Sequence, residues 1–235
     1  MRLLPHIHRV FVTITRNDLI PLNRITILNQ VIREGIVAIL RLDDEKQVMP
    51  LVEALAAGGV HAIEITMGTP GVLRHIERIA THRPDVLIGV GSVLDAETAR
   101  MALHAGAGFI VTPVTKREIT EMAHRYDAPV FSGAFTPGEI LTAFEGGADV
   151  VKVFPAEVLG IPYLKAVLAP MPQLRLMPTG GVTVDNAADW LRAGACALGV
   201  GSALVDKKAL AAGDFMSIRA KAEAFVRAVA QHKAG

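Results

Sequence analysis

Short runs of apolar, often β-branched residues alternate along the chain with longer segments whose apolar residues recur at helical spacing. The short runs are typical of strands buried on both faces, and the longer segments are typical of helices that cover them. Eight strand-like runs occur, at residues 36–41, 60–66, 86–92, 108–113, 129–133, 149–155, 174–179 and 197–202. This alternation predicts a parallel sheet with helices on both faces.

The number of units favours a closed barrel, because an open doubly wound sheet of about 200 residues usually has fewer strands. The residues at the start and at the end of the helical segments are those expected of helices that connect two strands. Three of them begin near a side chain that can cap a helix, Asp43, Asp95 or Thr183, and end at a glycine. The sequence therefore predicts an α/β protein with a single (β/α)8 TIM barrel domain.

The turns before alternate strands repeat a glycine, which gives the chain an internal period of two strand–helix units. These glycines are Gly58, Gly106, Gly146 and Gly194, and the residues six positions later are Glu64, Thr112, Lys152 and Val200. Alternate strands of such a barrel contribute side chains to one interior layer, so we expect these four residues to share a layer. Lys152 and Glu64 should then face each other across the barrel axis.

The barrel period covers residues 34–235, and residues 1–33 do not follow it. We expect an N-terminal extension or a barrel-closing helix there, because residues 24–35 have the pattern of an amphipathic helix. Residues 10–15 could form an extra strand or belong to an unstructured extension. Residues 215–233 are predicted to form the last helix, with an apolar side against the barrel.

Composition and charge narrow the classes of partner. Of the 235 residues, 51% are hydrophobic, and 24 basic against 23 acidic residues give a net charge of +1 without a basic stripe. We therefore expect no nucleic-acid partner. No apolar run reaches the roughly 20 residues of a membrane span and no signal-peptide core forms, so we expect no membrane partner. The single cysteine, Cys196, fits a reducing cytoplasm.

Lys152 is the candidate centre of the chemistry, because it lies in an apolar run that otherwise predicts a buried strand (ADVVKVFPAE, 148–157). Burial disfavours the charged form of lysine, and a neutral amine attacks carbonyl groups to form a Schiff base. Glu64 could move the protons that this chemistry requires. A buried structural ion pair is the alternative, but catalytic residues of this fold gather at the carboxyl ends of strands, where both residues lie.

Two glycine-rich turns indicate a phosphate site. Residues 178–182 (PTGGV) end the seventh strand, and residues 199–202 (GVGS) end the eighth. The loops after these two strands are the usual phosphate site of the barrel, and glycines let backbone N–H groups approach phosphate oxygens. We therefore expect a substrate with a phosphate or a comparable terminal anion.

Motifs in order from about residue 34 to residue 206 resemble the 2-keto-3-deoxy-6-phosphogluconate (KDPG) and 4-hydroxy-2-oxoglutarate (KHG) aldolase family. They are IVAILR, IEIT, GVGSVLD, IVTP, VVKVFPAE, PTGGV with Asp185 and Asn186, and GVGSALV. The resemblance implies a class I aldolase, commonly a homotrimer, that needs no metal or other cofactor. The implied substrate is a small phosphorylated keto acid: KDPG is cleaved to pyruvate and glyceraldehyde 3-phosphate, and KHG to pyruvate and glyoxylate.

The resemblance also implies a role for each matching residue. Lys152 would form the Schiff base with the C2 ketone, and Glu64 would be the general acid and base. Ser92, Pro113 and Phe154 would contact substrate, and Gly180, Gly181, Gly201 and Ser202 would hold the phosphate. Thr66, on the same side of the second strand as Glu64, is either a further substrate contact or core filling. The scattered histidines form no plausible metal set.

One position departs from the family pattern. Several members have an arginine four residues after the glutamate that binds the substrate carboxylate, and this chain has Gly68 there. We expect Arg41, at the end of the first strand, to take this role, or else to form a surface ion pair with Asp43, Asp44 or Glu45. Relatives that act on the galactonate epimer also lack the family arginine and carry a similar one on the first strand. The preferred epimer therefore stays open.

Two other functions remain open from the sequence. A different phosphate-binding barrel enzyme, an isomerase or a synthase, would use Glu64 and Lys152 as acid, base and charge without a Schiff base. A non-catalytic barrel would keep the two residues as a buried ion pair. A covalent adduct of pyruvate with Lys152 would exclude both.

Overall fold

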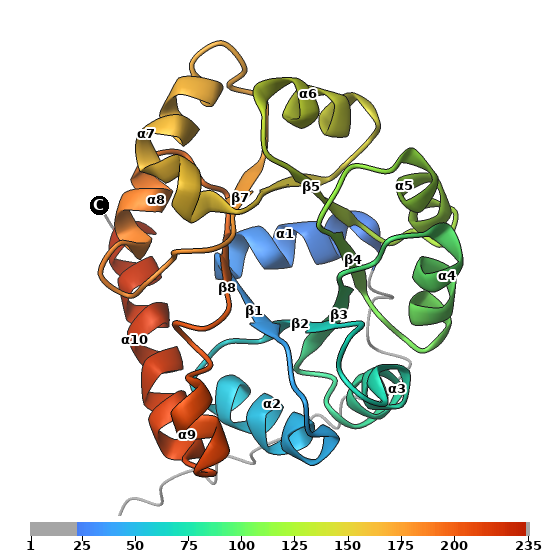
Figure 1. Cartoon of the computed structure of the whole chain (residues 1–235), viewed down its shortest axis with the longest axis vertical. Coiled ribbons are helices and arrows are strands. Elements are labelled where there is room, and N and C mark those ends of the chain that lie inside the picture. The colour runs from blue at the N-terminus through green and yellow to red at the C-terminus, as the bar shows by residue number, and fades with distance from the viewer. Residues whose placement is uncertain (1–22, 234–235) are drawn as a thin grey trace, which may run out of the picture.

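The computed structural model describes residues 23–233, which form a ring of parallel strands surrounded by helices (Figure 1). The strands are β1 (Ile36–Leu40), β2 (Ala62–Thr66), β3 (Leu87–Gly91), β4 (Phe109–Thr112), β5 (Val130–Ala134), β6 (Val150–Val153), β7 (Leu176–Pro178) and β8 (Leu198–Val200). Their order is β7-β6-β5-β4-β3-β2-β1-β8. Two isolated bridges, Leu176 with Ala195 and Thr179 with Gly199, close the ring between β7 and β8. The predicted barrel and its eight strands are confirmed.

Helices cover the outside of the ring. They are the 3-10 turn η1 (Glu45–Gln47), α2 (Val48–Ala57), α3 (Val72–His82), α4 (Ala96–His104), α5 (Arg117–His124), α6 (Pro137–Glu145), α7 (Ala156–Leu168), α8 (Ala187–Arg192), α9 (Lys207–Ala211) and α10 (Phe215–Lys233). Asp95 caps α4 as predicted, but the residue that caps η1 is Asp44 and not Asp43. Within residues 23–233, no helix has the length and apolarity needed to cross a membrane.

Side chains of the strands alternate between an outer and an inner cluster. Outward residues such as Ile63 and Val151 pack against the helices. Inward residues fill the barrel, where the rings of Phe109 and Phe131 stack with centroids 5.2 Å apart. Because residues of a strand alternate in direction, Glu64 and Lys152 point inward like the aromatic pair.

The predicted interior layer is right for Glu64 and Lys152 and wrong for Thr112 and Val200. Val200 belongs to the outer cluster, and Thr112 follows the inward Val111. The turns explain the error. In these four turns the glycine with a positive φ is Gly59 (88°), Gly106 (102°), Gly147 (92°) or Gly194 (103°). In the first and third turns this is the second of two adjacent glycines, whereas the prediction counted from the first. Counting five residues from each of these gives Glu64, Val111, Lys152 and Gly199, which are the inward positions.

Helix α1 (Arg24–Glu34) closes the amino end of the barrel, and Figure 1 shows it lying across the ring. Its residues Ile27, Leu28 and Val31 belong to the inner cluster. The side chain of Asn23 caps the first turn by accepting from the Thr26 N–H. The helix therefore forms where the amphipathic pattern predicts one, whereas the possible strand at residues 10–15 lies outside the described residues.

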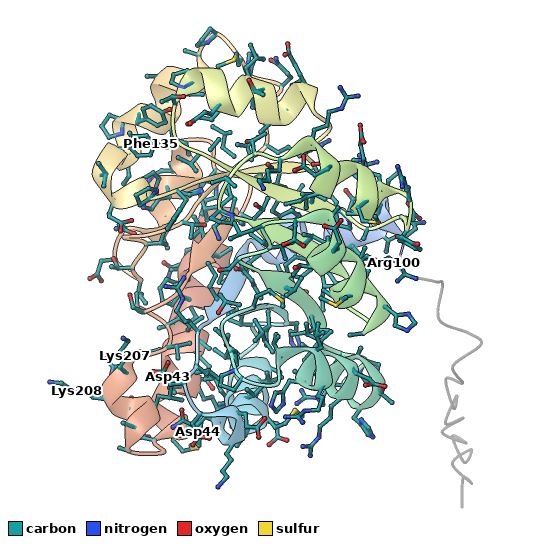
Figure 2. All side chains as sticks on the ribbon, turned by 45° about the vertical axis from the view of Figure 1, so that its right-hand side comes forward. Asp43, Asp44, Arg100, Phe135, Lys207 and Lys208 are labelled. Atoms are coloured by element: carbon teal, nitrogen blue, oxygen red, sulfur yellow. The ribbon has the colours of Figure 1, made fainter. Side chains whose placement is uncertain are left out.

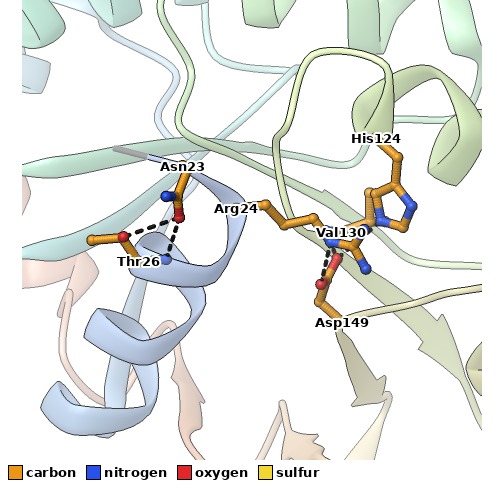
Figure 3. Close-up of polar contacts among 6 residues, drawn as sticks. All are labelled: Asn23, Arg24, Thr26, His124, Val130 and Asp149. Carbon is orange, nitrogen blue, oxygen red and sulfur yellow. Dashed lines mark hydrogen bonds and ion pairs between the residues drawn. The ribbon is translucent and has the colours of Figure 1, made fainter. Parts of the chain in front are cut away.

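One buried carboxylate connects α1 to the barrel wall (Figure 3). Asp149, whose side chain is 4% exposed, accepts hydrogen bonds from Arg24 Nε at 2.7 Å, His124 Nε2 at 3.1 Å and the Val130 N–H at 2.9 Å. The donors belong to α1, α5 and β5, so a single side chain joins three elements.

Asp149→Ala is therefore expected to destabilise the protein by about 2 to 3 kcal/mol, because three donors lose a buried, charged acceptor. Urea unfolding of the two proteins measures this loss. Asp189→Ala is the matched control, since Asp189 pairs with Arg192 on α8 and both side chains are half-exposed. Such a pair contributes less than about 1 kcal/mol. Equal losses for the two variants would contradict the role of Asp149.

Candidate active site

Lys152 and Glu64 meet inside the barrel. Lys152 lies on β6 and Glu64 on β2, and the distance from Lys152 Nζ to Glu64 Oε1 is 3.8 Å. Both residues are buried, with 6% and 1% of their surface exposed. The distance is that of an ion pair and exceeds a normal hydrogen bond. The structure thus brings together the two residues that the sequence places at the centre of the chemistry.

Burial dominates the electrostatics of Glu64. It raises the pKa of the carboxyl above its ordinary value, against the attraction of Lys152 and Arg41, which lowers it. Its second oxygen, Oε2, is buried and has no hydrogen-bond partner. A carboxyl group with a raised pKa and a free oxygen is suited to exchange protons with a bound molecule.

Four other predicted contacts lie at the same end of the barrel as this pair. Thr66 is 2% exposed, and its Oγ1 is buried without a partner. Ser92 follows β3 with a φ of 60°, a left-handed conformation that is rare for serine and recurs at functional sites. Pro113 follows β4, and the ring centroid of Phe154 lies 5.5 Å from Lys152 Nζ. All four are at the carboxyl ends of strands.

The two glycine-rich turns lie side by side at the closure of the barrel, because Thr179 and Gly199 form a bridge. Gly180 and Gly181 have φ values of 99° and 70°, which a residue with a side chain rarely adopts. Gly201 and Ser202 follow β8 in the neighbouring turn, and the carbonyl of Gly201 accepts from the N–H groups of residues 204 and 205. The predicted phosphate residues therefore gather in one place.

Asn186 fixes the shape of the first turn. Its Nδ2 donates to the carbonyl of Gly181 at 2.9 Å, and its Oδ1 accepts from the Thr183 N–H at 2.8 Å. These bonds hold the Gly181 carbonyl toward α8. The Asn186 side chain therefore stabilises the turn, although Asn186 lies at the start of α8. It makes no capping hydrogen bond to the helix.

Thr179 is a candidate site residue that the sequence motifs did not indicate. It is 5% exposed, and its Oγ1 is buried without a hydrogen-bond partner, like Thr66 Oγ1 and Glu64 Oε2. The inward Met177 precedes it by two residues, so Thr179 also points inward. The alternation of β7 indicates that Thr179 points inward. The glycines that follow indicate a role for backbone N–H groups and none for the Thr179 side chain. Three unpartnered buried oxygens thus lie on inward-facing side chains, two on β2 and one just after β7, and a polar ligand inside this end of the barrel would satisfy them.

Arg41 lies at the same end of the barrel. It follows β1, and its charge lowers the pKa of Glu64. The loop that contains Gly68 is joined to the same segment, because the Leu42 N–H donates to Thr69 Oγ1 at 3.3 Å. A Cβ atom at Gly68 would have no heavy atom within 4 Å, so this loop leaves open space where several family members carry an arginine.

Two of the acidic residues after Arg41 have other partners. Asp44 caps η1, and Glu45 binds Arg74 with 2.9 Å between Oε2 and Nη2. Figure 2 shows Asp43 and Asp44 in the same region of the view as Lys207 and Lys208 of α9. Among the described residues, the ion pairs within 4 Å do not include Arg41. The alternative from the sequence, a surface ion pair of Arg41 with Asp43, Asp44 or Glu45, is therefore wrong.

The described part of the chain contains no group of three or more His, Cys, Asp and Glu residues that could hold a metal ion. The polar atoms that converge on Lys152 are hydroxyl, carboxyl and guanidinium groups. Such groups bind an organic acid through hydrogen bonds and charge.

Several proteins with similar sequences or structures are named as aldolases. The family model for KDPG and KHG aldolase matches residues 27–221. The 2-dehydro-3-deoxy-phosphogluconate aldolase of Pseudomonas aeruginosa is 36% identical over 199 residues, which cover 84% of this chain and 90% of that protein. A solved structure described as native KDPGal has a TM-score of 0.79 and 32% identity, and the match covers 85% of this chain and 96% of that one.

A further solved structure is the KDPG aldolase of Legionella pneumophila, with pyruvate captured at low pH as a covalent carbinolamine intermediate. Its TM-score is 0.77 at 28% identity, and the match covers 85% of this chain and 96% of that one. The family match extends over most of the barrel and includes the strands that carry Lys152, Glu64 and the two glycine-rich turns. This chain belongs to the KDPG and KHG aldolase family.

Proposed function

We propose that the protein is a class I aldolase that cleaves KDPG to pyruvate and glyceraldehyde 3-phosphate through a Schiff base on Lys152. The observation that carries the proposal is the buried pair of Lys152 and Glu64, 3.8 Å apart at the carboxyl end of the barrel. The relative from Legionella supports the covalent route, because a carbinolamine with pyruvate forms when an amine adds to its ketone.

Each step follows from an amine and a carboxyl group in contact. Lys152 Nζ adds to the C2 ketone, and loss of water from the carbinolamine gives an iminium ion. The iminium accepts the electron pair of the C3–C4 bond while the C4 hydroxyl loses its proton, and glyceraldehyde 3-phosphate leaves. The enamine takes a proton at C3, and hydrolysis releases pyruvate and restores the amine. Glu64 exchanges these protons, and its raised pKa brings it closer to the working pH.

The remaining residues hold the substrate. Gly180, Gly181, Gly201 and Ser202 bind the phosphate with backbone N–H groups and a hydroxyl, and Thr66, Ser92, Pro113 and Phe154 surround the carbons that react. Arg41 binds the carboxylate, because its charge reaches the site and Gly68 offers no side chain for this purpose.

Trapping with borohydride tests the covalent step. The protein is incubated with pyruvate and sodium borohydride and weighed intact, and the modified peptide is then identified. We expect a gain of one reduced pyruvate adduct on Lys152. A folded protein that gains no adduct would contradict the proposal and would favour a phosphate-binding isomerase or synthase without a Schiff base.

Two observations favour a second substrate, the galactonate epimer of KDPG. The open space at Gly68 and the position of Arg41 are the features in which this chain departs from the usual family pattern. One similar structure is described as native KDPGal. The ratio of kcat/KM values for the two epimers, together with that for KHG, identifies the preferred substrate.

We also propose that the enzyme is a homotrimer, as the family resemblance implies, and that it works in the cytoplasm, which the single cysteine fits. Exposed apolar side chains near the carboxyl ends of the strands support an interface between subunits: Leu94 is 51% exposed, Val114 45% and Val158 70%. Sedimentation should then give three times the chain mass of 25.0 kDa.

A further inference from the structure

Gly91, the last residue of β3, has no side chain where the carboxyl group of Glu64 lies. A Cβ atom at this position would lie 1.7 Å from Glu64 Oε1, 2.4 Å from its Cδ and 2.7 Å from its Cγ. Such distances are impossible for unbonded atoms. The carboxyl group therefore occupies the space that any side chain at residue 91 would need.

The backbone of Gly91 does not require glycine. Its φ is not positive, unlike that of Gly180 or Gly181, so alanine could adopt the same conformation. The reason for glycine is thus the space beside the backbone. Gly91 differs in this respect from Gly180 and Gly181 of the proposed phosphate turn, whose positive φ values disfavour residues with a side chain.

The pairing of β2 with β3 explains how the contact arises. Glu64 is the register partner of Gly89, and Thr66 is the partner of Gly91. The Glu64 side chain therefore leans along the barrel wall toward the carboxyl end and lies over the neighbouring strand two residues further on. Gly89 makes room for a different group, because a Cβ atom there would lie 2.4 Å from the ring of Phe109.

We propose that Gly91 is a positioning residue for the general acid and base: the space that it leaves holds the Glu64 carboxyl group beside the Lys152 amine. The inference rests on the proposed function, in which Glu64 exchanges protons at the Schiff base. Glu64 Oε2 has no hydrogen-bond partner, so no hydrogen bond to that oxygen fixes the position of the carboxyl group. The shape of the barrel wall at Gly91 therefore contributes more to that position.

This geometry predicts different effects on folding and on catalysis. In a Gly91→Ala variant the overlapping atoms are the end of a flexible side chain, which can rotate away, so the barrel should still fold. The rotated carboxyl group is then misplaced for proton transfer. A displacement of about 1 Å can cost on the order of 100-fold in rate.

A double-mutant cycle tests the proposal with kcat/KM for KDPG cleavage. We expect Gly91→Ala to lower kcat/KM by about 100-fold in the wild-type background. In a Glu64→Ala background, where no carboxyl group can be displaced, the same change should lower it by less than about twofold. Wild-type activity in Gly91→Ala, or an equal loss in both backgrounds, would overturn the proposal.

Gly89→Ala is the matched control on the same strand. It creates a similar overlap with Phe109 in the core, so it should lower the urea midpoint more than Gly91→Ala and lower kcat less. An equal loss of kcat in the two variants would assign the effect to packing and overturn the proposal.

If Gly91→Ala does not fold, the Glu64→Ala/Gly91→Ala protein decides the question, because the overlap is then absent. A folded double variant supports the contact with Glu64, and an unfolded one overturns it. The proposed function is tested separately: a wild-type protein that releases no pyruvate contradicts that function, whereas an active wild type with an unaffected Gly91→Ala variant contradicts only the role of Gly91.

Discussion

Lys152→Met is expected to lower kcat for carbon–carbon cleavage by at least about 10⁴-fold, because the proposed reaction has no electron sink without the iminium ion. Methionine is unbranched and apolar like the stem of lysine, so it should fit on the inward face of β6 beside Val150. Pyruvate release coupled to lactate dehydrogenase measures the rate. Borohydride should trap no pyruvate on this variant.

The fold should survive this change. The buried Glu64 loses its positive partner, but its pKa is already raised by burial, and an isolated buried carboxylate takes a proton instead of remaining charged. Lys165→Met, an exposed position on α7, controls for the loss of a lysine elsewhere. Cleavage above about 1% of the wild-type rate in a folded Lys152→Met protein would contradict the covalent role of Lys152.

Glu64→Gln is expected to lower kcat by about 10² to 10⁴-fold, the usual contribution of a positioned acid–base group. The amine remains, so pyruvate should still be trapped on Lys152 during a long incubation. This retained adduct distinguishes the variant from Lys152→Met. Glu77→Gln, an exposed position on α3, is the matched control and should keep wild-type activity. A Glu64→Gln enzyme with wild-type kcat would remove Glu64 from the mechanism.

The same variant should change how stability depends on pH. Burial raises the pKa of Glu64 above its ordinary value of 4.5, so the folded protein binds this proton more tightly than the unfolded chain. The stability that this group contributes is therefore full below the ordinary carboxyl pKa and is lost as the pH rises through the raised pKa. The stability of wild type relative to Glu64→Gln should thus fall as the pH rises above 4.5 in urea unfolding experiments. A constant difference over this range would contradict the raised pKa.

The sequence pattern was sufficient for the eight strands, because each run is short, apolar and followed by a helix. It was also sufficient for the meeting of Lys152 with Glu64, since a charged residue in a buried strand needs a partner. It failed for Thr112 and Val200, because the choice between two adjacent glycines depends on which one has a positive φ. A shift of one residue moves a side chain to the other face.

Thr179 and Gly91 show another limit of the sequence. The importance of Thr179 comes from a missing hydrogen-bond partner, and that of Gly91 comes from a side chain on the neighbouring strand. Both depend on how strands far apart in the sequence are placed side by side. A glycine between an apolar residue and a serine has no feature in the sequence that distinguishes a need for space from an ordinary turn.

The closed amino end of the barrel bears on the order in which products depart. Helix α1 and the inner cluster fill the barrel beneath Lys152, so small molecules reach the amine from the carboxyl end. In the proposed reaction, cleavage leaves pyruvate bonded to the nitrogen and the aldehyde fragment nearer the rim. The aldehyde occupies the route by which water must enter to hydrolyse the adduct. Its departure before the keto acid, and the reverse order of entry in synthesis, would follow from a barrel with a single opening.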